Sequence, residues 1–168
     1  MSYRQWYAQL DVFDTIRRYT ALLSRWTTDA PNRERLFVAD FYLVNPPLLH
    51  KTQMTSAARK AFNSLGVPKP ENTFVQLPSP TLLYNKMAGI QSEALHNLIG
   101  RGLCEVDAAD KGIYRLSGEG IKFSVGLAQS LVLPREEGVL RFLTNEFSTV
   151  GIGKGGLRAA TGLRRIGV

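Results

Sequence analysis

One segment of the sequence is apolar on nearly every side of a helix. Residues 33–45, RERLFVADFYLVN, follow Asn32, which is a suitable N-cap, and stop before Pro46, which cannot continue the helix. A helix with apolar side chains all round has to be covered by other elements in every direction. We therefore expect this helix at the centre of a mainly helical core.

The carboxylate of Asp40 interrupts this apolar surface. A buried carboxylate is costly unless a cation or a hydrogen-bond donor compensates its charge. We expect Asp40 to pair with a basic residue such as Arg33 or Arg59, or to cap a neighbouring helix. A catalytic role would need a second acid or base nearby, and the sequence shows none.

The region after Pro80 has the order of elements of a winged helix. TLLYNKM reads as a short helix, AG as a turn, and IQSEALHNLIGRGL as a second helix. Two apolar runs, Leu103–Val106 and Ile113–Leu116, flank DAADKG, which is typical of a β-hairpin with a six-residue tip. Ser117 is placed to cap a further helix. This order predicts a mainly α (α+β) winged helix-turn-helix, with residues 36–44 as its first helix.

The 168 residues divide into a single domain with helical extensions. Leu10–Trp26 carries one apolar stripe at helical spacing, as an amphipathic helix does. The expected division is an N-terminal helical extension at 1–30, a winged-helix domain at 31–133 with an insertion around 50–78, a C-terminal helix at 134–150, and a basic Gly-rich tail at 151–168.

Positive charge is concentrated in the tail. The whole chain has a formal net charge of +7, and residues 151–168 hold four cations and no acid. We expect a flexible tail whose cations hold a nucleic-acid backbone or an acidic partner.

The second helix of the winged region is weakly equipped to read DNA. Gln91 and Asn97 are suited to base edges, and Arg101 to a phosphate, but Glu93 would be repelled by the backbone. The tip DAADKG places two acids before its one lysine. The charge therefore favours protein docking over sequence-specific reading. The candidate DNA-binding residues are Gln91, Asn97, Arg101, Lys111, Lys154, Arg158, Arg164 and Arg165.

No motif of the sequence predicts catalysis, a cofactor or a metal site. GIGKGG (Gly151–Gly156) fits G-x-G-x-x-G in form but has no acid after it for a ribose. Cys104 is the only cysteine, and the two histidines lie on separate elements. We expect a protein that is not an enzyme. The N-terminus lacks the apolar core of a signal peptide and no apolar run is long enough to span a bilayer, so we expect a cytoplasmic location.

Two stretches resemble a known family. RERLFVADFYLVNPPLL (Arg33–Leu49) and LYNKMAGIQSEALHNLIGRGLCEV (Leu83–Val106) resemble the middle components of bacterial ABC-three-component systems, which include the small accessory subunit of Lamassu-type anti-phage defence complexes. The resemblance implies an accessory subunit that binds an SMC- or Rad50-like ATPase and an effector subunit, often a nuclease. It also implies that the effector is held inactive until foreign DNA is sensed, with double-stranded DNA contacted through the complex and no membrane contact.

Two other classes of function stay open. A winged-helix transcriptional regulator would use Leu10–Trp26 and Arg135–Val150 as a dimer interface, and predicts specific, salt-dependent binding of a homodimer to DNA. An adaptor without nucleic-acid contact predicts no DNA affinity even at low salt. The acid-bearing helix argues against the regulator, and the basic tail argues against the adaptor.

Overall fold

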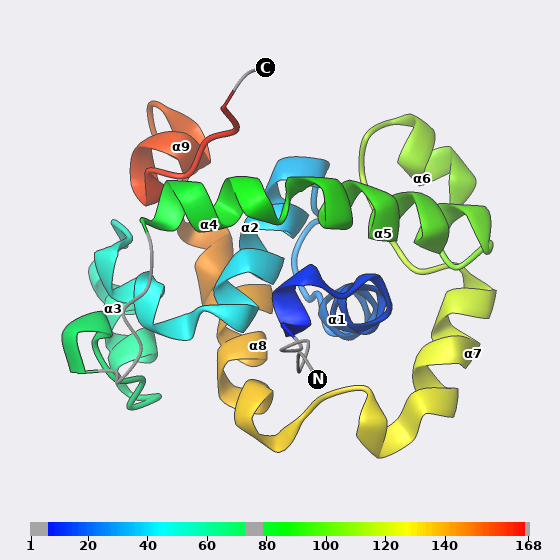
Figure 1. Cartoon of the computed structure of the whole chain (residues 1–168), viewed down its shortest axis with the longest axis horizontal. Helices are drawn as coiled ribbons and strands as arrows, with labels where there is room; N and C mark the ends of the chain where they lie inside the picture. Colours follow the sequence, from blue (N-terminus) through cyan, green and yellow to red (C-terminus); the bar gives the residue numbers. More distant parts are fainter. Residues whose placement is uncertain (1–6, 73–78, 167–168) are drawn as a thin grey trace, which may run out of the picture.

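The computed structural model describes residues 7–72 and 79–166 and is mainly helical in that part (Figure 1). Residues 73–78 of the expected insertion lie outside it. The helices are α1 (Val12–Ser24), α2 (Arg33–Val44), α3 (Ser56–Asn63), α4 (Pro80–Lys86), α5 (Ala88–Gly100), α6 (Val106–Asp110), α7 (Gly118–Leu127), α8 (Glu137–Thr144) and α9 (Gly156–Thr161). Short 3₁₀ segments are Ala8–Leu10, Pro46–Lys51, Pro70–Asn72, Ala128–Ser130, Pro134–Glu136 and Glu146–Thr149.

Helix α2 lies at the centre of the core, as its all-round apolar surface predicts. Every residue from Leu36 to Leu43 is buried, Asp40 included. The Asn32 side chain accepts a hydrogen bond from Arg35 N at 2.9 Å and so caps the first turn. The helix ends at Val44, two residues before Pro46. The start expected from the sequence is confirmed, and the helix ends one residue earlier than the expected Asn45.

The hydrophobic core joins the ends of the chain to its middle. α1 packs chiefly against α5 and also against α2, with Tyr19 and Leu22 fully buried. α8 supplies Leu140 and Phe142 to the same cluster of buried side chains. Figure 1 shows α1 nearly end-on, with α2, α5, α7 and α8 around it.

The region after Pro80 does not form the expected crossed helix pair and β-wing. Only Met87 separates α4 from α5, its backbone stays in the right-handed helical region, and the two helices run end to end in Figure 1. The predicted hairpin is also wrong, because α6 occupies its tip. The cause is local: Ala108 and Ala109 favour a helix, and Ala108 buries its methyl group. The bridge between Cys104 and Leu116 is the only pairing between the two apolar runs among the described residues.

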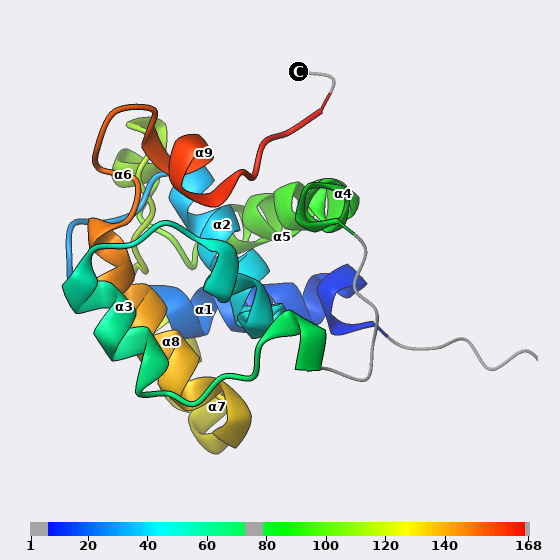
Figure 2. The same ribbon diagram turned by 90° about the vertical axis from the view of Figure 1, so that its left-hand side faces the viewer.

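The expected tail is folded over residues 151–166. α9 buries Leu157, and Leu163 after it is also buried. The segment is bonded to α4: Asn85 Nδ2 donates to Arg164 O at 2.8 Å, and Ile166 N donates to Asn85 Oδ1 at 2.8 Å. Figure 2 shows α9 beside α2, with the chain after α9 running toward α4. The expectation of a flexible tail is therefore wrong, because apolar residues between the cations anchor it to the body.

Candidate functional site

The partner of the buried Asp40 carboxylate is Arg18. Arg18 Nε donates to Asp40 Oδ1 at 2.6 Å, and both side chains are 0% exposed. A second nitrogen of the same guanidinium donates to Asp14 Oδ2 at 2.6 Å. The sequence expectation of Arg33 or Arg59 as the partner is therefore wrong. The pair links α1 to α2 inside the core.

Gln91 continues this polar network toward the surface. Its side chain is 0% exposed, and Nε2 donates to Asp40 Oδ2 and to Phe37 O, at 3.0 Å in each case. Its Oε1 accepts a hydrogen bond from Arg165. Gln91 was expected on the outer face of its helix, and the structure places it inside. Its amide is occupied by protein partners and is not positioned to meet a base.

Arg165 is the outer end of the network. Its guanidinium carbon lies 3.7 Å from the centroid of the Tyr84 ring and 5.6 Å from that of Phe37. It also donates a hydrogen bond to Tyr84 O. Burial lowers the pKa of Arg165, and repulsion from the nearby Arg33 guanidinium lowers the pKa further, against the raising effect of the tyrosines.

Arg33 approaches the same aromatic ring from the first turn of α2. Its guanidinium carbon lies 5.2 Å from the centroid of the Phe37 ring. Its Nη2 donates to Ser92 Oγ of α5 at 2.7 Å. Within residues 7–72 and 79–166, neither Arg33 nor Arg165 forms an ion pair with a carboxylate. Two cations thus share one aromatic surface without a counter-ion.

A pocket of about 480 Å³ opens at this place, between α2, α5 and the folded C-terminal segment. We call it the arginine pocket. Among its lining residues Glu34 is the one carboxylate, and it pairs with Arg158 at 3.6 Å. The pocket is lined by Arg33, Glu34, Phe37, Tyr84, Ala88, Ser92, Arg158, Leu163, Arg164 and Arg165. Its four arginines and single glutamate give it an excess of positive charge, which suits an anionic ligand.

The sequence-predicted residues are divided between this pocket and separate surfaces. Arg158, Arg164 and Arg165 line the pocket, although no pattern in the sequence predicts that they meet. Arg33, which completes the set, was considered only as a partner for Asp40. The remaining candidates lie outside it: Asn97 donates to Glu93 O at 2.9 Å, and Arg101, Lys111 and Lys154 are exposed.

Comparison with known proteins identifies the family. The family model described as ABC-three component (ABC-3C) system Middle Component 5 matches residues 4–166. The chain belongs to this family. The match confirms the resemblance to ABC-three-component middle components and extends it to the whole arginine pocket. No curated protein and no solved structure gave a significant match.

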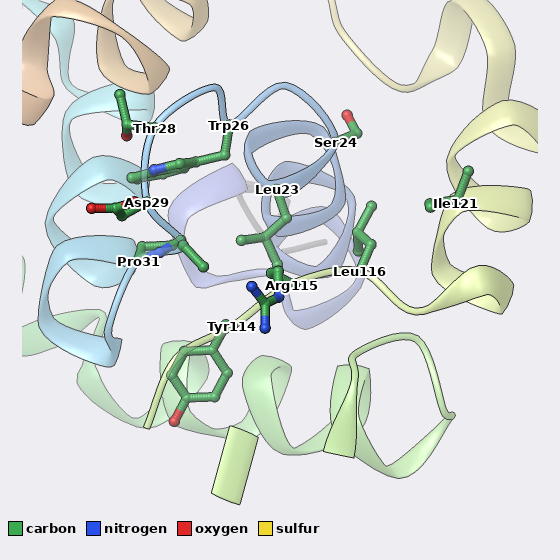
Figure 3. Close-up of a pocket in the computed structure, with 11 residues that line it drawn as sticks. Leu23, Ser24, Trp26, Thr28, Asp29, Pro31, Tyr114, Arg115, Leu116 and Ile121 are labelled. Carbon is green, nitrogen blue, oxygen red and sulfur yellow. The ribbon is translucent and has the colours of Figure 1, made fainter. Parts of the chain in front are cut away.

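A second pocket of this middle component, of about 370 Å³, lies beside the end of α1 (Figure 3). Figure 3 shows Ile121 of α7 across from Leu116, with Trp26 and Pro31 on the other side. Trp26 Nε1 is buried without a hydrogen-bond partner in the described part of the chain. The one arginine of this pocket, Arg115, is paired with Glu105 at 3.1 Å. This pocket therefore lacks the unpaired arginines of the arginine pocket, and its other charged residue, Asp29, is an acid.

The described residues show neither a metal cluster nor a reactive thiol. They contain no group of three or more His, Cys, Asp or Glu placed to hold a metal ion. Burial raises the pKa of Cys104 to about 11, with a smaller contribution from Glu105, which leaves the thiol protonated near neutral pH. No helix in this part of the chain combines the length and the apolar character that a membrane crossing requires.

Proposed function

We propose that this middle component is a non-catalytic accessory subunit of an SMC- or Rad50-like ATPase complex in bacterial anti-phage defence. In this role it binds the ATPase and an effector nuclease and helps the complex to sense DNA. These are the roles that the resemblance to the small subunit of Lamassu-type complexes implies. Family membership supports the general part, because a middle component of a three-component system works with other proteins.

The proposed DNA contact rests on the arginine pocket. Arg33, Arg164 and Arg165 form no ion pair in the described structure, and guanidinium groups bind phosphate oxygens through paired N–H donors. Contacts to phosphates provide affinity and position without reading sequence. The proposed role is accordingly to hold DNA in the complex irrespective of its sequence.

The regulator alternative is weakened by the same structure. Gln91 is buried, and α6 stands where a β-wing was expected. Gln91, one of the two candidates for contacting base edges, therefore does not lie on the surface. The adaptor alternative keeps support from α7, where Ile121 and Val125 expose apolar side chains one helical turn apart.

Purification of the tagged full chain from its own host, with nuclease treatment and mass spectrometry, tests the assembly. We expect a large coiled-coil ATPase in stoichiometric amount. Recovery of the protein alone, as a homodimer, would contradict the accessory-subunit role and favour the regulator.

Fluorescence anisotropy with a labelled duplex tests the DNA contact on the same complex. We expect affinity that falls steeply with salt and does not depend on sequence, because counter-ions are released from the phosphates. Absence of binding at low salt would instead support the adaptor.

A further inference from the structure

The arginine pocket holds more positive charge than its own carboxylate neutralises. Glu34 is engaged by Arg158, so Arg33, Arg164 and Arg165 have no counter-ion in the described structure. Arg33 and Arg165 stand over the same Phe37 ring, and each raises the electrostatic cost of the other's charge. A bound anion would relieve this repulsion, and no protein group in the described structure does so.

Some N–H donors of the pocket are held in place by protein contacts, and others are free to bind a ligand. An arginine carries five N–H donors. Arg165 commits bonds to Tyr84 O and to Gln91 Oε1, and its stacking on the Tyr84 ring fixes the plane of its guanidinium. Arg33 is exposed and donates only to the Ser92 hydroxyl. One guanidinium is therefore fixed, while the other can adjust to a ligand, and both keep unused N–H groups.

We propose that the arginine pocket binds a single phosphate group between Arg33 and Arg165, with Arg164 and the Ser92 hydroxyl at its rim. A phosphate is favoured over a carboxylate because it carries more charge and more acceptor oxygens, which suits three unpaired guanidinium groups around one space. The phosphate of a nucleic-acid strand and that of a free nucleotide share this chemistry. Only the first source rests on the proposed function; the pocket itself does not.

NMR spectroscopy of the ¹⁵N-labelled full chain tests the proposal. Three probes are titrated at matched ionic strength: inorganic phosphate, a 5′-phosphorylated thymidine dinucleotide, and the same dinucleotide without the terminal phosphate. We expect saturable shifts at the amides of Arg33, Phe37, Ser92 and Arg165. If phosphate and the phosphorylated dinucleotide saturate the shifts and the unphosphorylated dinucleotide does not, the pocket binds a terminal phosphate. If all three probes saturate the shifts, the pocket binds any phosphate of a strand.

Charge variants provide the controls. Arg33→Gln should weaken binding about tenfold, as expected for one charge-assisted hydrogen-bonded contact. Glu34→Gln should tighten binding, because it removes the carboxylate that competes for the pocket. Arg141→Gln is the matched control on the exposed surface of α8 and should bind as the parent does.

Three results would overturn the proposal: absence of saturable shifts with every probe, equal binding by Arg33→Gln and the parent, or equal weakening by Arg141→Gln. Failure of the proposed function is a separate outcome. The pocket could saturate with phosphate while the purified complex shows no affinity for duplex DNA, and in that case the phosphate site stands and the DNA role falls.

Discussion

Arg18 and Asp40 form an ion pair that is completely enclosed between α1 and α2, with Arg18 Nε 2.6 Å from Asp40 Oδ1. Two charges withdrawn from water are tolerated only when further hydrogen bonds compensate them. Here Asp14 and Thr15 accept hydrogen bonds from the guanidinium, and Gln91 donates one to the carboxylate. The pair therefore joins three helices at the centre of the core and connects them to the arginine pocket through Gln91.

We expect Asp40→Ala to destabilise the fold by about 3–5 kcal/mol, because it leaves the Arg18 charge buried without its main partner. Urea unfolding followed by circular dichroism measures the change in the free energy of unfolding. The double variant Arg18→Met with Asp40→Leu should recover most of the loss, since both charges are then removed.

The matched control for this pair is an exposed one. Arg25 and Glu137 are bonded at the surface, with side chains 43% and 55% exposed. Glu137→Gln should change the stability by less than about 1 kcal/mol. A loss of stability in Asp40→Ala as small as that of the control would contradict the structural role of the pair.

The folded C-terminal segment gives a second prediction. Leu157 is 7% exposed in α9, so Leu157→Ala should cost about 2 kcal/mol in unfolding free energy, at the low end for a core leucine. Limited trypsin digestion should also become faster after Lys154 and Arg158, because the segment detaches. Ile166→Ala is the control, since Ile166 is 67% exposed at the same end of the chain. Rapid cleavage of the parent chain at these two sites would show instead that the segment is not held.

The sequence predicts the core better than the surface. The apolar pattern of α2, its Asn32 cap and the Ser117 cap of α7 are local signals, and the structure confirms all three. The prediction of a hairpin was wrong because two neighbouring alanines and a buried methyl group favour α6 at the expected tip. The short-range pattern is sufficient where a helix is decided by its own residues.

The arginine pocket could not be predicted in this way. Arg33 and Arg165 lie 132 positions apart by their numbers, and they meet only because Leu157 and Leu163 fold the segment back onto α2 and α4. The inward position of Gln91 likewise depends on Asp40, a residue of another helix. Composition identified the excess charge of this segment, but long-range packing decides which cations gather.

A third prediction concerns the DNA contact of the proposed function. Reversal of charge at Lys154, Arg158 and Arg164, all exposed, should weaken binding of a labelled duplex by the complex and flatten its salt dependence. Each lost phosphate contact lowers the slope of log affinity against log salt by about 0.9. Reversal at Lys60, Arg135 and Arg141 makes the same change in net charge elsewhere on the surface. If both triple variants weaken binding equally, net charge alone would account for the affinity.

The final prediction concerns the thiol of Cys104, which is 2% exposed and whose pKa is raised by burial to about 11, from the ordinary 9.0. Between these two pKa values the thiol of the folded state keeps its proton, whereas the thiol of the unfolded state loses it. The contribution to stability is complete below pH 9 and is lost as the pH rises toward 11. Cys104→Ala should reduce this alkaline loss of stability, measured by urea unfolding at pH 8 and pH 10.5. At pH 8 the folded thiol should react with iodoacetamide far more slowly than the thiol in urea. Equal rates in the two states would contradict the burial of this side chain.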